Sequence, residues 1–339
     1  MQRCIELASK AEGLTYPNPM VGAVIVNEEK IIGEGFHLRA GEPHAEVIAI
    51  NSVTDKSLLK HSALYVNLEP CSHVGKTPPC ADFIIASGIR KVVIGATDTS
   101  SKVSGKGIEK LEKSGCEVST GILEKECRHL NRRFFTSVEK NRPYVILKWA
   151  QSSDGFIDVI RESGHPTTPT WITGAVEKTL VHKWRSEEQA ILVGAGTVRA
   201  DNPRLDVREW TGNQPIRLII SRSGQIDKNS AVFIQEGQWL MFTTADNKID
   251  NKQIINIDGT KPSSVQILEY LHSQGIQSIF IEGGAEIHNH FIENNLWDEA
   301  RVFTGKSAFG TGVKAPKLTV TKPTKTVALS GSRLDYYSN

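Results

Sequence analysis

Four side chains of types that bind and use a zinc ion occur in two short segments of the chain. His44 and Glu46 are separated by one residue, and Cys71 and Cys80 each follow a proline. One imidazole and two thiolates leave the fourth tetrahedral position of zinc open to water, and zinc lowers the pKa of that water from ~15.7 to about 7. The pattern therefore predicts a hydrolytic zinc site, with the histidine and both cysteines as metal ligands and Glu46 as an unbound proton carrier.

Each of these features is common when it stands alone. A His-x-Glu triplet usually lies on a solvated helix face, and cysteines are often inert core residues. Here, however, the triplet 44–46 precedes the apolar helical run 47–50, and the strand-like segment 63–67 leads to Glu69-Pro70-Cys71. This order of elements is the one that zinc nucleobase deaminases require, so we interpret the segment as a deaminase site.

The spacing of the two cysteines indicates which kind of deaminase the chain resembles. Deaminases usually have Cys-x-x-Cys, whereas the segment Ser72 to Pro79 separates the two cysteines here. This spacing, with Glu69 to His73, Lys76 to Cys80 and Pro17 to Gly22, resembles the deaminase domain of bacterial bifunctional riboflavin-biosynthesis proteins of the RibD type. Asn18 stands between two prolines and is equally typical of a plain turn, but the resemblance implies that it lies beside the substrate.

Composition favours a small substrate. The length of 339 residues suggests about two domains. The 40 basic and 38 acidic residues are balanced in both halves, so neither half has the basic surplus that nucleic acid binding needs. The five cysteines show no disulfide-framework spacing, the N-terminus does not resemble a secretion signal, and no apolar run approaches ~18 residues. We expect a cytoplasmic protein that binds neither nucleic acid nor membranes.

The first half alternates between helical and strand-like patterns. The expected elements are a helix over 4–11, a hairpin of 21–26 and 31–36, a helix from 44, a strand over 63–67, a helix over 81–87, a strand over 92–96, a helix over 109–114, a strand over 116–118 and a helix over 123–137. Such alternation predicts a layered α/β domain over residues 1–140. The polar segment 139–143 ends in proline and is the best linker candidate.

The second half, 143–339, lacks the dinucleotide fingerprint that a reductase often has. Gly194-Ala195-Gly196 follows a predicted strand but has no third glycine. Glu282-Gly283-Gly284 lies between a predicted strand, 278–281, and a predicted helix, 285–294, where bare backbone could receive a phosphate. Glycines at such junctions are equally often simple turn residues. The remaining predicted elements are strands over 144–149, 190–193, 216–220, 239–242, 253–257 and 300–304 and helices over 175–186 and 265–274.

Segments of the second half resemble the reductase domain of the same family. They are Leu147-Lys148, Ser153-Asp154-Gly155, Trp171-Ile172-Thr173, Arg185, Gly194 to Arg199, Ala200 to Pro203, Leu205, Arg208 and Glu282-Gly283-Gly284. That domain has a fold like dihydrofolate reductase and uses NADPH, which accounts for the missing fingerprint. The resemblance implies cofactor contacts at Ala150, Trp171, Thr197, Asp201, Gly284, Ala285, Glu286, Ile287, His288, Asn289 and His290. It implies substrate contacts at Arg185, Leu205, Arg208 and Glu282, with the arginines suited to bidentate phosphate binding.

Three features depart from the family pattern. Ser153 stands where a leucine usually precedes Asp-Gly, and Arg222 stands where the family pattern has a small hydroxyl residue expected to contact the cofactor. The segment 160–170 does not match the small Ser/Gly-rich stretch expected before Trp171, so substrate contacts over 158–170 are left unassigned.

The sequence thus predicts a bifunctional riboflavin-biosynthesis enzyme with one zinc ion, NADPH and a phosphorylated pyrimidine substrate, and we expect a homo-oligomer. The fold expected is a cytidine-deaminase-like three-layer α/β domain followed by a dihydrofolate-reductase-like domain. One alternative, a tRNA-editing deaminase, would not need the second half and should carry excess basic charge. Another, a binding protein with structural zinc, would need a fourth protein ligand, for which His73 is the nearby candidate.

Overall fold

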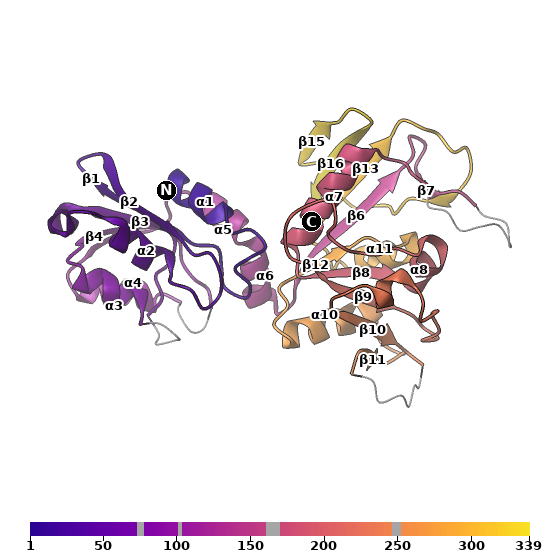
Figure 1. The fold of residues 1–339 in the computed structure, drawn as a ribbon, viewed down its shortest axis with the longest axis horizontal. Coiled ribbons are helices and arrows are strands. Elements are labelled where there is room, and N and C mark those ends of the chain that lie inside the picture. Colours follow the sequence, from indigo (N-terminus) through magenta and orange to yellow (C-terminus); the bar gives the residue numbers. More distant parts are fainter. Residues whose placement is uncertain (73–77, 101–103, 161–169, 246–251) are drawn as a thin grey trace. The chain divides into compact units, whose positions relative to one another are not determined.

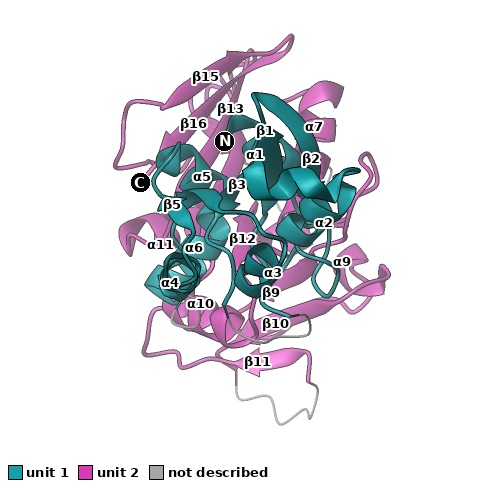
Figure 2. Ribbon diagram, turned by 90° about the vertical axis from the view of Figure 1, so that its left-hand side faces the viewer, with its two compact units in different colours: residues 1–141 teal, residues 142–339 magenta. Residues whose placement is uncertain are grey.

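The computed structural model describes residues 1–72, 78–100, 104–160, 170–245 and 252–339 (Figure 1). His73 and most of the segment 160–170 lie outside these ranges. The described residues form two compact units, Met1–Asn141 and Arg142–Asn339, which Figure 2 colours teal and magenta. Within the described ranges, no helix is long and apolar enough to cross a membrane.

The first unit is built on a sheet whose described strands follow the order β2-β1-β3-β4-β5. β1 (Gly22–Asn27) pairs antiparallel with both β2 (Lys30–Phe36) and β3 (Ala63–Leu68). β4 (Lys91–Ala96) runs parallel to β3, and β5 (Glu117–Ser119) runs parallel to β4. The carboxyl ends of β3 and β4 therefore meet at one edge, and Cys71 follows β3 at that edge.

Helices cover this sheet and place the zinc-site residues. They are α1 (Gln2–Ser9), α2 (Ala45–Ser52), the 3₁₀ helix Lys56–His61, α3 (Cys80–Ala86), α4 (Lys106–Lys113), α5 (Glu124–Leu130) and α6 (Arg132–Lys140). α2 lies directly on β2, because a Cβ atom on Gly35 would stand only 2.6 Å from the Ala45 carbonyl oxygen. His44 is the N-cap residue of α2 and Cys80 is the first residue of α3.

The prediction of one helix over 123–137 is wrong. The chain forms two helices, α5 and α6, with Asn131 between them at φ −97° and ψ 24°. The Asn131 side chain binds the backbone of Met20 instead of facing solvent, and helix α6 then continues to Lys140. A helical sequence pattern carries no signal for this distant backbone partner.

The second unit contains a sheet whose described strands follow the order β11-β10-β9-β8-β12-β6-β13-β16-β15. The strands are β6 (Tyr144–Gln151), β8 (Ala190–Gly194), β9 (Ile216–Ile220), β10 (Trp239–Thr243), β11 (Ile254–Asn256), β12 (Ser278–Ile281), β13 (Glu299–Gly305), β15 (Lys325–Ala328) and β16 (Ser332–Ser338). From β11 at one edge through β10, β9, β8, β12 and β6 to β13, neighbouring strands run parallel to each other. β16 is antiparallel to both β13 and β15. A separate ribbon joins β7 (Phe156–Asp158) to β14 (Val313–Lys314).

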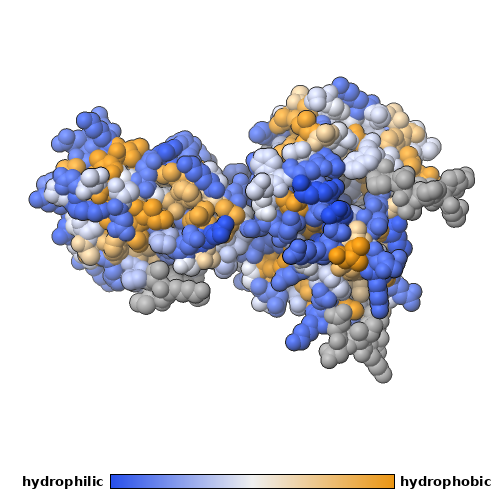
Figure 3. Space-filling model, in the orientation of Figure 1, coloured by the Kyte–Doolittle hydropathy of each residue, from blue (hydrophilic) through white to orange (hydrophobic). Residues whose placement is uncertain are grey.

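Both faces of this sheet are covered by helices, which explains the apolar sequences of its central strands. The helices are α7 (Ala175–Glu187), α8 (Ala195–Asp201), α9 (Ala231–Ile234), α10 (Ser263–Ser273) and α11 (Ala285–Glu293). One core packs α10 and α11 against Val145 and Leu147, and the other packs α7 against Ile146. On the face shown in Figure 3, hydrophilic residues dominate the surface of both units, with apolar residues in small groups among them.

Candidate active sites

Three potential metal ligands converge in the first unit. His44 Nδ1, Cys71 Sγ and Cys80 Sγ all lie within 4.8 Å of one another, and no second group of this kind occurs among the described residues. His44 Nδ1 is 3.1 Å from Cys80 Sγ and 3.6 Å from Cys71 Sγ. The N-cap of α2, the loop after β3 and the start of α3 thus bring three donor atoms together.

The chemistry of this donor set fits zinc. The backbone N–H of Cys80 donates to Cys71 Sγ at 3.3 Å. Hydrogen bonding from the Cys80 side chain lowers the pKa of Cys71, and the interaction with His44 lowers it further. The same hydrogen bond raises the pKa of Cys80, so the two sulfur atoms share one proton that a metal ion would displace. One imidazole nitrogen and two sulfur atoms are ligands that zinc accepts, and they leave one tetrahedral position for a further group.

Glu46 lies close to the three potential ligands but outside their converging group. It lies in the first turn of α2, is only 3% exposed and is not part of the converging group of ligands. Burial raises the pKa of Glu46 from 4.5 to about 7. A carboxyl group whose pKa is near neutrality can both accept and return a proton.

Asn18 reaches the same region through His37, a residue that the sequence analysis did not single out. Asn18 Nδ2 lies 3.0 Å from His37 Nε2, and His37 Nδ1 lies 3.1 Å from the carbonyl oxygen of Pro43. The His37 ring packs edge-on against the His44 ring, with 5.3 Å between their centroids. The predicted substrate residue is therefore connected to a predicted metal ligand through one intervening imidazole, although nothing in the sequence pattern marked His37.

The second unit holds a cavity of about 760 Å³. It brings together most of the residues predicted for the reductase site, namely Ala150, Trp171, Arg185, Thr197, Asp201, Leu205, Arg208, Glu282, Gly284, Ala285, Glu286 and His288. Ile287, Asn289 and His290 are not among its lining residues. Those three lie on α11, where Ile287 packs against the core and His290 Nε2 accepts a hydrogen bond from the Ser264 backbone at 3.3 Å.

Arg185 and Glu282 form a buried two-bond ion pair in the cavity wall. Arg185 Nε and Nη2 donate to the Glu282 carboxylate at 2.6 and 2.9 Å, and Arg185 Nη1 donates to the Asp206 carbonyl oxygen at 3.1 Å. Burial by itself would raise the pKa of Glu282, but the charges of Arg185 and Lys148 outweigh it and hold that pKa at about 2. The guanidinium fork of Arg185 is therefore committed to a carboxylate.

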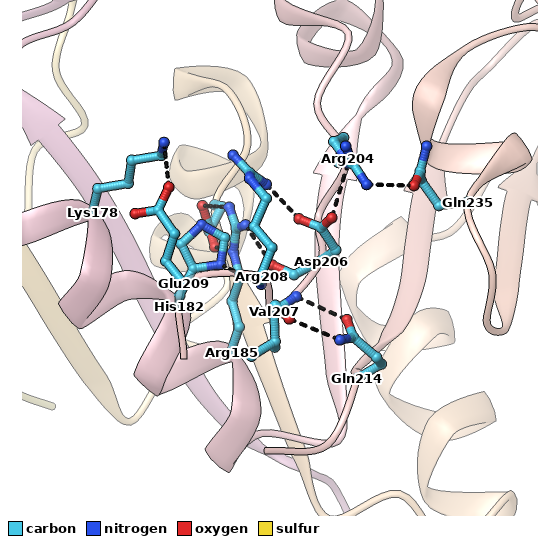
Figure 4. Close-up of polar contacts among 11 residues, drawn as sticks. Lys178, His182, Arg185, Arg204, Asp206, Val207, Arg208, Glu209, Gln214 and Gln235 are labelled. Carbon is cyan, nitrogen blue, oxygen red and sulfur yellow. Dashed lines mark hydrogen bonds and ion pairs between the residues drawn. The ribbon is translucent and has the colours of Figure 1, made fainter. Parts of the chain in front are cut away.

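Arg208 lies beside Arg185 (Figure 4) and is more exposed than it. Its guanidinium forms an ion pair with Asp206, its backbone N–H donates to His182 Nδ1 at 3.3 Å, and its side chain is 39% exposed. Arg204 also binds Asp206, at 2.9 Å, so two arginines share one carboxylate at the cavity. This cluster has more positive than negative charge, which suits an anionic group of a ligand.

Lys148 and His182 are among the cavity residues that received no role from the sequence. Lys148 Nζ lies 3.7 Å from Glu282, and burial lowers the pKa of Lys148. His182, on α7, lines the cavity, and burial followed by the charge of Arg185 lowers the pKa of His182. A lysine inside a strand and a histidine inside a helix are ordinary features of sequences, so only the cavity itself identifies them.

The turn between β12 and α11 can receive a phosphate of a dinucleotide. Gly284 has φ 63°, and a Cβ atom on Gly283 would stand 2.6 Å from Val193 Cα, so this turn packs closely on β8. Gly284, Ala285 and Glu286, at the start of α11, line the cavity, and helix N-termini favour anionic groups. Thr197 and Asp201 of α8 line the same cavity, so the residues present fit NADPH.

Comparison with known proteins agrees with this division into two sites. Residues 1–96 match the family model of the cytidine and deoxycytidylate deaminase zinc-binding region, and residues 143–331 match the RibD C-terminal domain. The riboflavin biosynthesis protein RibD of Aquifex aeolicus (strain VF5) is 39% identical over 92% of this chain and 88% of its own length. The protein of the same name from Escherichia coli (strain K12) is 34% identical over 93% and 89%.

Solved structures of full-length relatives show the same fold. A diaminohydroxyphosphoribosylaminopyrimidine deaminase/5-amino-6-(5-phosphoribosylamino)uracil reductase from Thermotoga maritima has a TM-score of 0.85 and 38% identity, covering 99% of this chain and 96% of that one. Acinetobacter baumannii RibD has a TM-score of 0.87 and 30% identity, with coverage of 99% and 96%. The predicted combination of a cytidine-deaminase-like domain with a RibD-type reductase domain is confirmed.

Proposed function

The chain belongs to the RibD family of bifunctional riboflavin-biosynthesis enzymes, and from this premise we propose which of its residues carry each reaction. It is a zinc-dependent deaminase and an NADPH-dependent reductase that acts on a small phosphorylated pyrimidine. The substrate is 2,5-diamino-6-ribosylamino-4(3H)-pyrimidinone 5′-phosphate, and the final product is 5-amino-6-ribitylaminouracil 5′-phosphate. We assign deamination to residues 1–140 and reduction to residues 143–339.

For deamination, the convergence of three metal-type donors beside a buried carboxyl group carries the proposal. His44, Cys71 and Cys80 hold zinc, which when bound supplies an ionisable water molecule at neutral pH. Glu46 accepts a proton from the attacking water and passes it to a ring nitrogen of the pyrimidine. It then transfers a proton to the departing ammonia. Asn18, with both a donor and an acceptor, binds the polar edge of the ring.

For reduction, the cavity of the second unit carries the proposal. NADPH, when bound, would supply a hydride to C1 of the ribosyl chain in its open imine form, and the second hydrogen is the proton already on the imine nitrogen. The glycine turn before α11 and residues Thr197 and Asp201 hold the cofactor. Because the pKa of Glu282 is about 2, this side chain is ionised at neutral pH, so its remaining lone pairs accept hydrogen bonds from the substrate.

The substrate phosphate is assigned to Arg208 rather than to the fork of Arg185. Arg185 Nε and Nη2 both form hydrogen bonds with Glu282, whereas the Arg208 guanidinium is paired with Asp206 and is partly exposed. Arg185 then contributes to substrate binding by holding Glu282 in place, and Leu205 lines the same cavity.

Two further properties belong to the proposal. The zinc-binding thiolates require reducing conditions, which supports a cytoplasmic location. The assembly is proposed to be a homo-oligomer, which light scattering at several protein concentrations tests directly.

One experiment tests both activities. The protein is incubated with the diaminopyrimidinone phosphate, with and without NADPH, and the products are identified by mass spectrometry. Without NADPH we expect the deaminated product, in which a carbonyl oxygen has replaced an amino group of the ring, a net exchange of NH for O. With NADPH we expect the same product with two additional hydrogens. Recovery of unchanged substrate from zinc-loaded protein would refute the assignment of the first site.

A further inference from the structure

A buried asparagine far from the zinc ligands in sequence holds the backbone beside the deaminase site. Asn131 is 2% exposed and interrupts the helical segment between α5 and α6. Its Oδ1 accepts from the Met20 N–H at 2.8 Å, and its Nδ2 donates to the Met20 carbonyl oxygen at 2.9 Å. The side-chain amide thus pairs with both polar groups of one residue, as a neighbouring strand would.

A second buried asparagine holds the same segment from the sheet side. Asn67, in β3, accepts from the Gly22 N–H at 2.7 Å and donates to the Met20 carbonyl oxygen at 3.0 Å. Met20 is itself 7% exposed. Two side chains from distant parts of the chain therefore fix the backbone that enters β1, and the oxygen of Met20 receives a hydrogen bond from each of them.

This fixed backbone lies two residues from Asn18. Pro19 joins them and restricts rotation of the chain, so a displacement of Met20 is passed to Asn18. The Asn18 N–H also donates to the Thr15 carbonyl oxygen at 2.9 Å. At the other end, Asn18 Nδ2 donates to His37 Nε2, a tautomer that leaves His37 Nδ1–H to donate to Pro43. A continuous set of contacts thus runs from the helix break to the active site.

The interruption of the helix supports a specific role for this arrangement. A continuous helix over α5 and α6 would turn residue 131 into an ordinary helical position and would lose its hold on Met20. Burying an amide is costly unless its hydrogen bonds are made, and here both polar atoms have backbone partners. The local sequence pattern favours helix, so the long-range contact decides the conformation.

We propose that Asn131 is a positioning residue for deamination, which sets the location of the Asn18 side chain through the backbone of Met20. The inference rests on the proposed function, because it assumes that Asn18 contacts the pyrimidine. Asn131 does not touch the substrate and does not hold the metal. Its loss should therefore weaken substrate binding in the first site and leave the metal site and the second unit unchanged.

The test compares Asn131→Ala, Asn18→Ala and the double variant, with deamination and reduction both measured on each full-length, zinc-loaded protein. Losing one productive hydrogen bond corresponds to roughly a 3- to 10-fold change. We expect Asn131→Ala to raise KM for deamination by about that factor, with kcat nearly constant. Zinc content and the kinetics of reduction should match those of the parent.

The double variant distinguishes a positioning role of Asn131 from a general destabilisation of the first unit. If Asn131 acts through Asn18, the double variant should have the same KM as Asn18→Ala alone, because coupled residues are not additive. Asn27→Ala is a control in the same unit, since Asn27 Nδ2 donates to the His61 carbonyl oxygen at 3.2 Å and has no hydrogen bond to Met20. It should leave KM unchanged.

Each other outcome has a definite meaning. If Asn18→Ala raises KM but Asn131→Ala does not, or if the two effects multiply, the positioning role is wrong while the role of Asn18 stands. If Asn18→Ala itself leaves KM unchanged, the assumed substrate contact fails and the inference fails with it. Should Asn131→Ala lose zinc or fail to fold, Asn131→Asp replaces the Nδ2 donor with a carboxylate oxygen that repels the Met20 carbonyl oxygen and so displaces the Met20 backbone. An unchanged KM for deamination in that variant would overturn the proposal.

Discussion

At the scale of single residues, the pairing of Arg185 with Glu282 changes how the reductase cavity can bind its substrate. Residue types alone made Arg185 and Arg208 equal candidates for a phosphate. The structure separates them, because the two bonds from Arg185 to Glu282 use the fork that would bind two phosphate oxygens. Sequence can supply the list of chemically suitable groups, but it does not indicate which donors other side chains already occupy.

The first prediction concerns the charge of Glu282. Its folded-state pKa of about 2 lies below the ordinary 4.5, so its contribution to stability is complete above about pH 4.5 and is lost as the pH falls towards 2. In Glu282→Gln this acid-sensitive contribution should disappear. Arg185 and Lys148 also lose their buried counter-charge, and we expect a loss of about 3 to 5 kcal/mol in the free energy of unfolding at neutral pH.

Urea unfolding measured between pH 2 and neutrality checks this expectation. The matched control is Glu286→Gln, because Glu286 also pairs with an arginine, at 2.7 Å from Arg222, but is 77% exposed. Exposed pairs contribute less than about 1 kcal/mol. Equal effects of the two substitutions would show that the Glu282 pair is not buried in solution.

The second prediction concerns the phosphate. Arg208→Lys should raise KM for reduction about 10-fold, because an ammonium group cannot form the planar two-bond contact. Steady-state kinetics with the deaminated substrate and NADPH provide the measurement. Arg333→Lys is the control, since Arg333 also pairs with an aspartate, Asp335 on β16 at 2.8 Å, but does not line the cavity. An unchanged KM in the Arg208 variant would move the phosphate to another part of the cavity.

At the scale of elements, the sequence predicted the parallel strands well because they are buried on both faces and therefore uniformly apolar. It did not predict β15 and β16. β16 contains the polar residues Arg333 and Asp335, and its pairing with β13 is set by a partner about 30 residues away rather than by its own pattern. The break at Asn131 was missed for the same reason, since Met20 is its partner.

The third prediction concerns the packing of β12 and α11 on β8. A methyl group at residue 283 would stand 2.6 Å from Val193 Cα, so Gly283→Ala must push the glycine turn away from the strand. We expect a weaker affinity for NADPH, measured by fluorescence titration, with deamination unchanged. Gly259→Ala is the control, because its added methyl group would stand at an ordinary 3.6 Å from Thr244. Parent affinity in Gly283→Ala would show that the turn does not hold the cofactor.

At the scale of the whole molecule, each unit contains the residues proposed for one reaction. The three metal-type donors and Glu46 lie within Met1–Asn141, and the described cavity is lined only by residues of Arg142–Asn339. This separation was foreseeable from the sequence, because the two sets of motifs lie on opposite sides of the polar segment 139–143. The two chemistries also place different demands on the protein, so they should be separable by one substitution.

The fourth prediction uses Glu46→Gln to separate them. The amide has nearly the same shape and leaves His44, Cys71 and Cys80 in place, but it cannot accept a proton. General acid–base groups contribute about 10² to 10⁴ in rate, and a group that transfers more than one proton should lie near the upper end. Deamination should therefore nearly stop. Reduction takes its hydride from the cofactor. The variant, when given already deaminated substrate, should therefore oxidise NADPH at close to the parent rate, which the absorbance of NADPH measures.

If a folded, zinc-loaded Glu46→Gln protein loses both activities, the reductase site depends on the deaminase unit, and the assignment of one reaction to each unit is wrong.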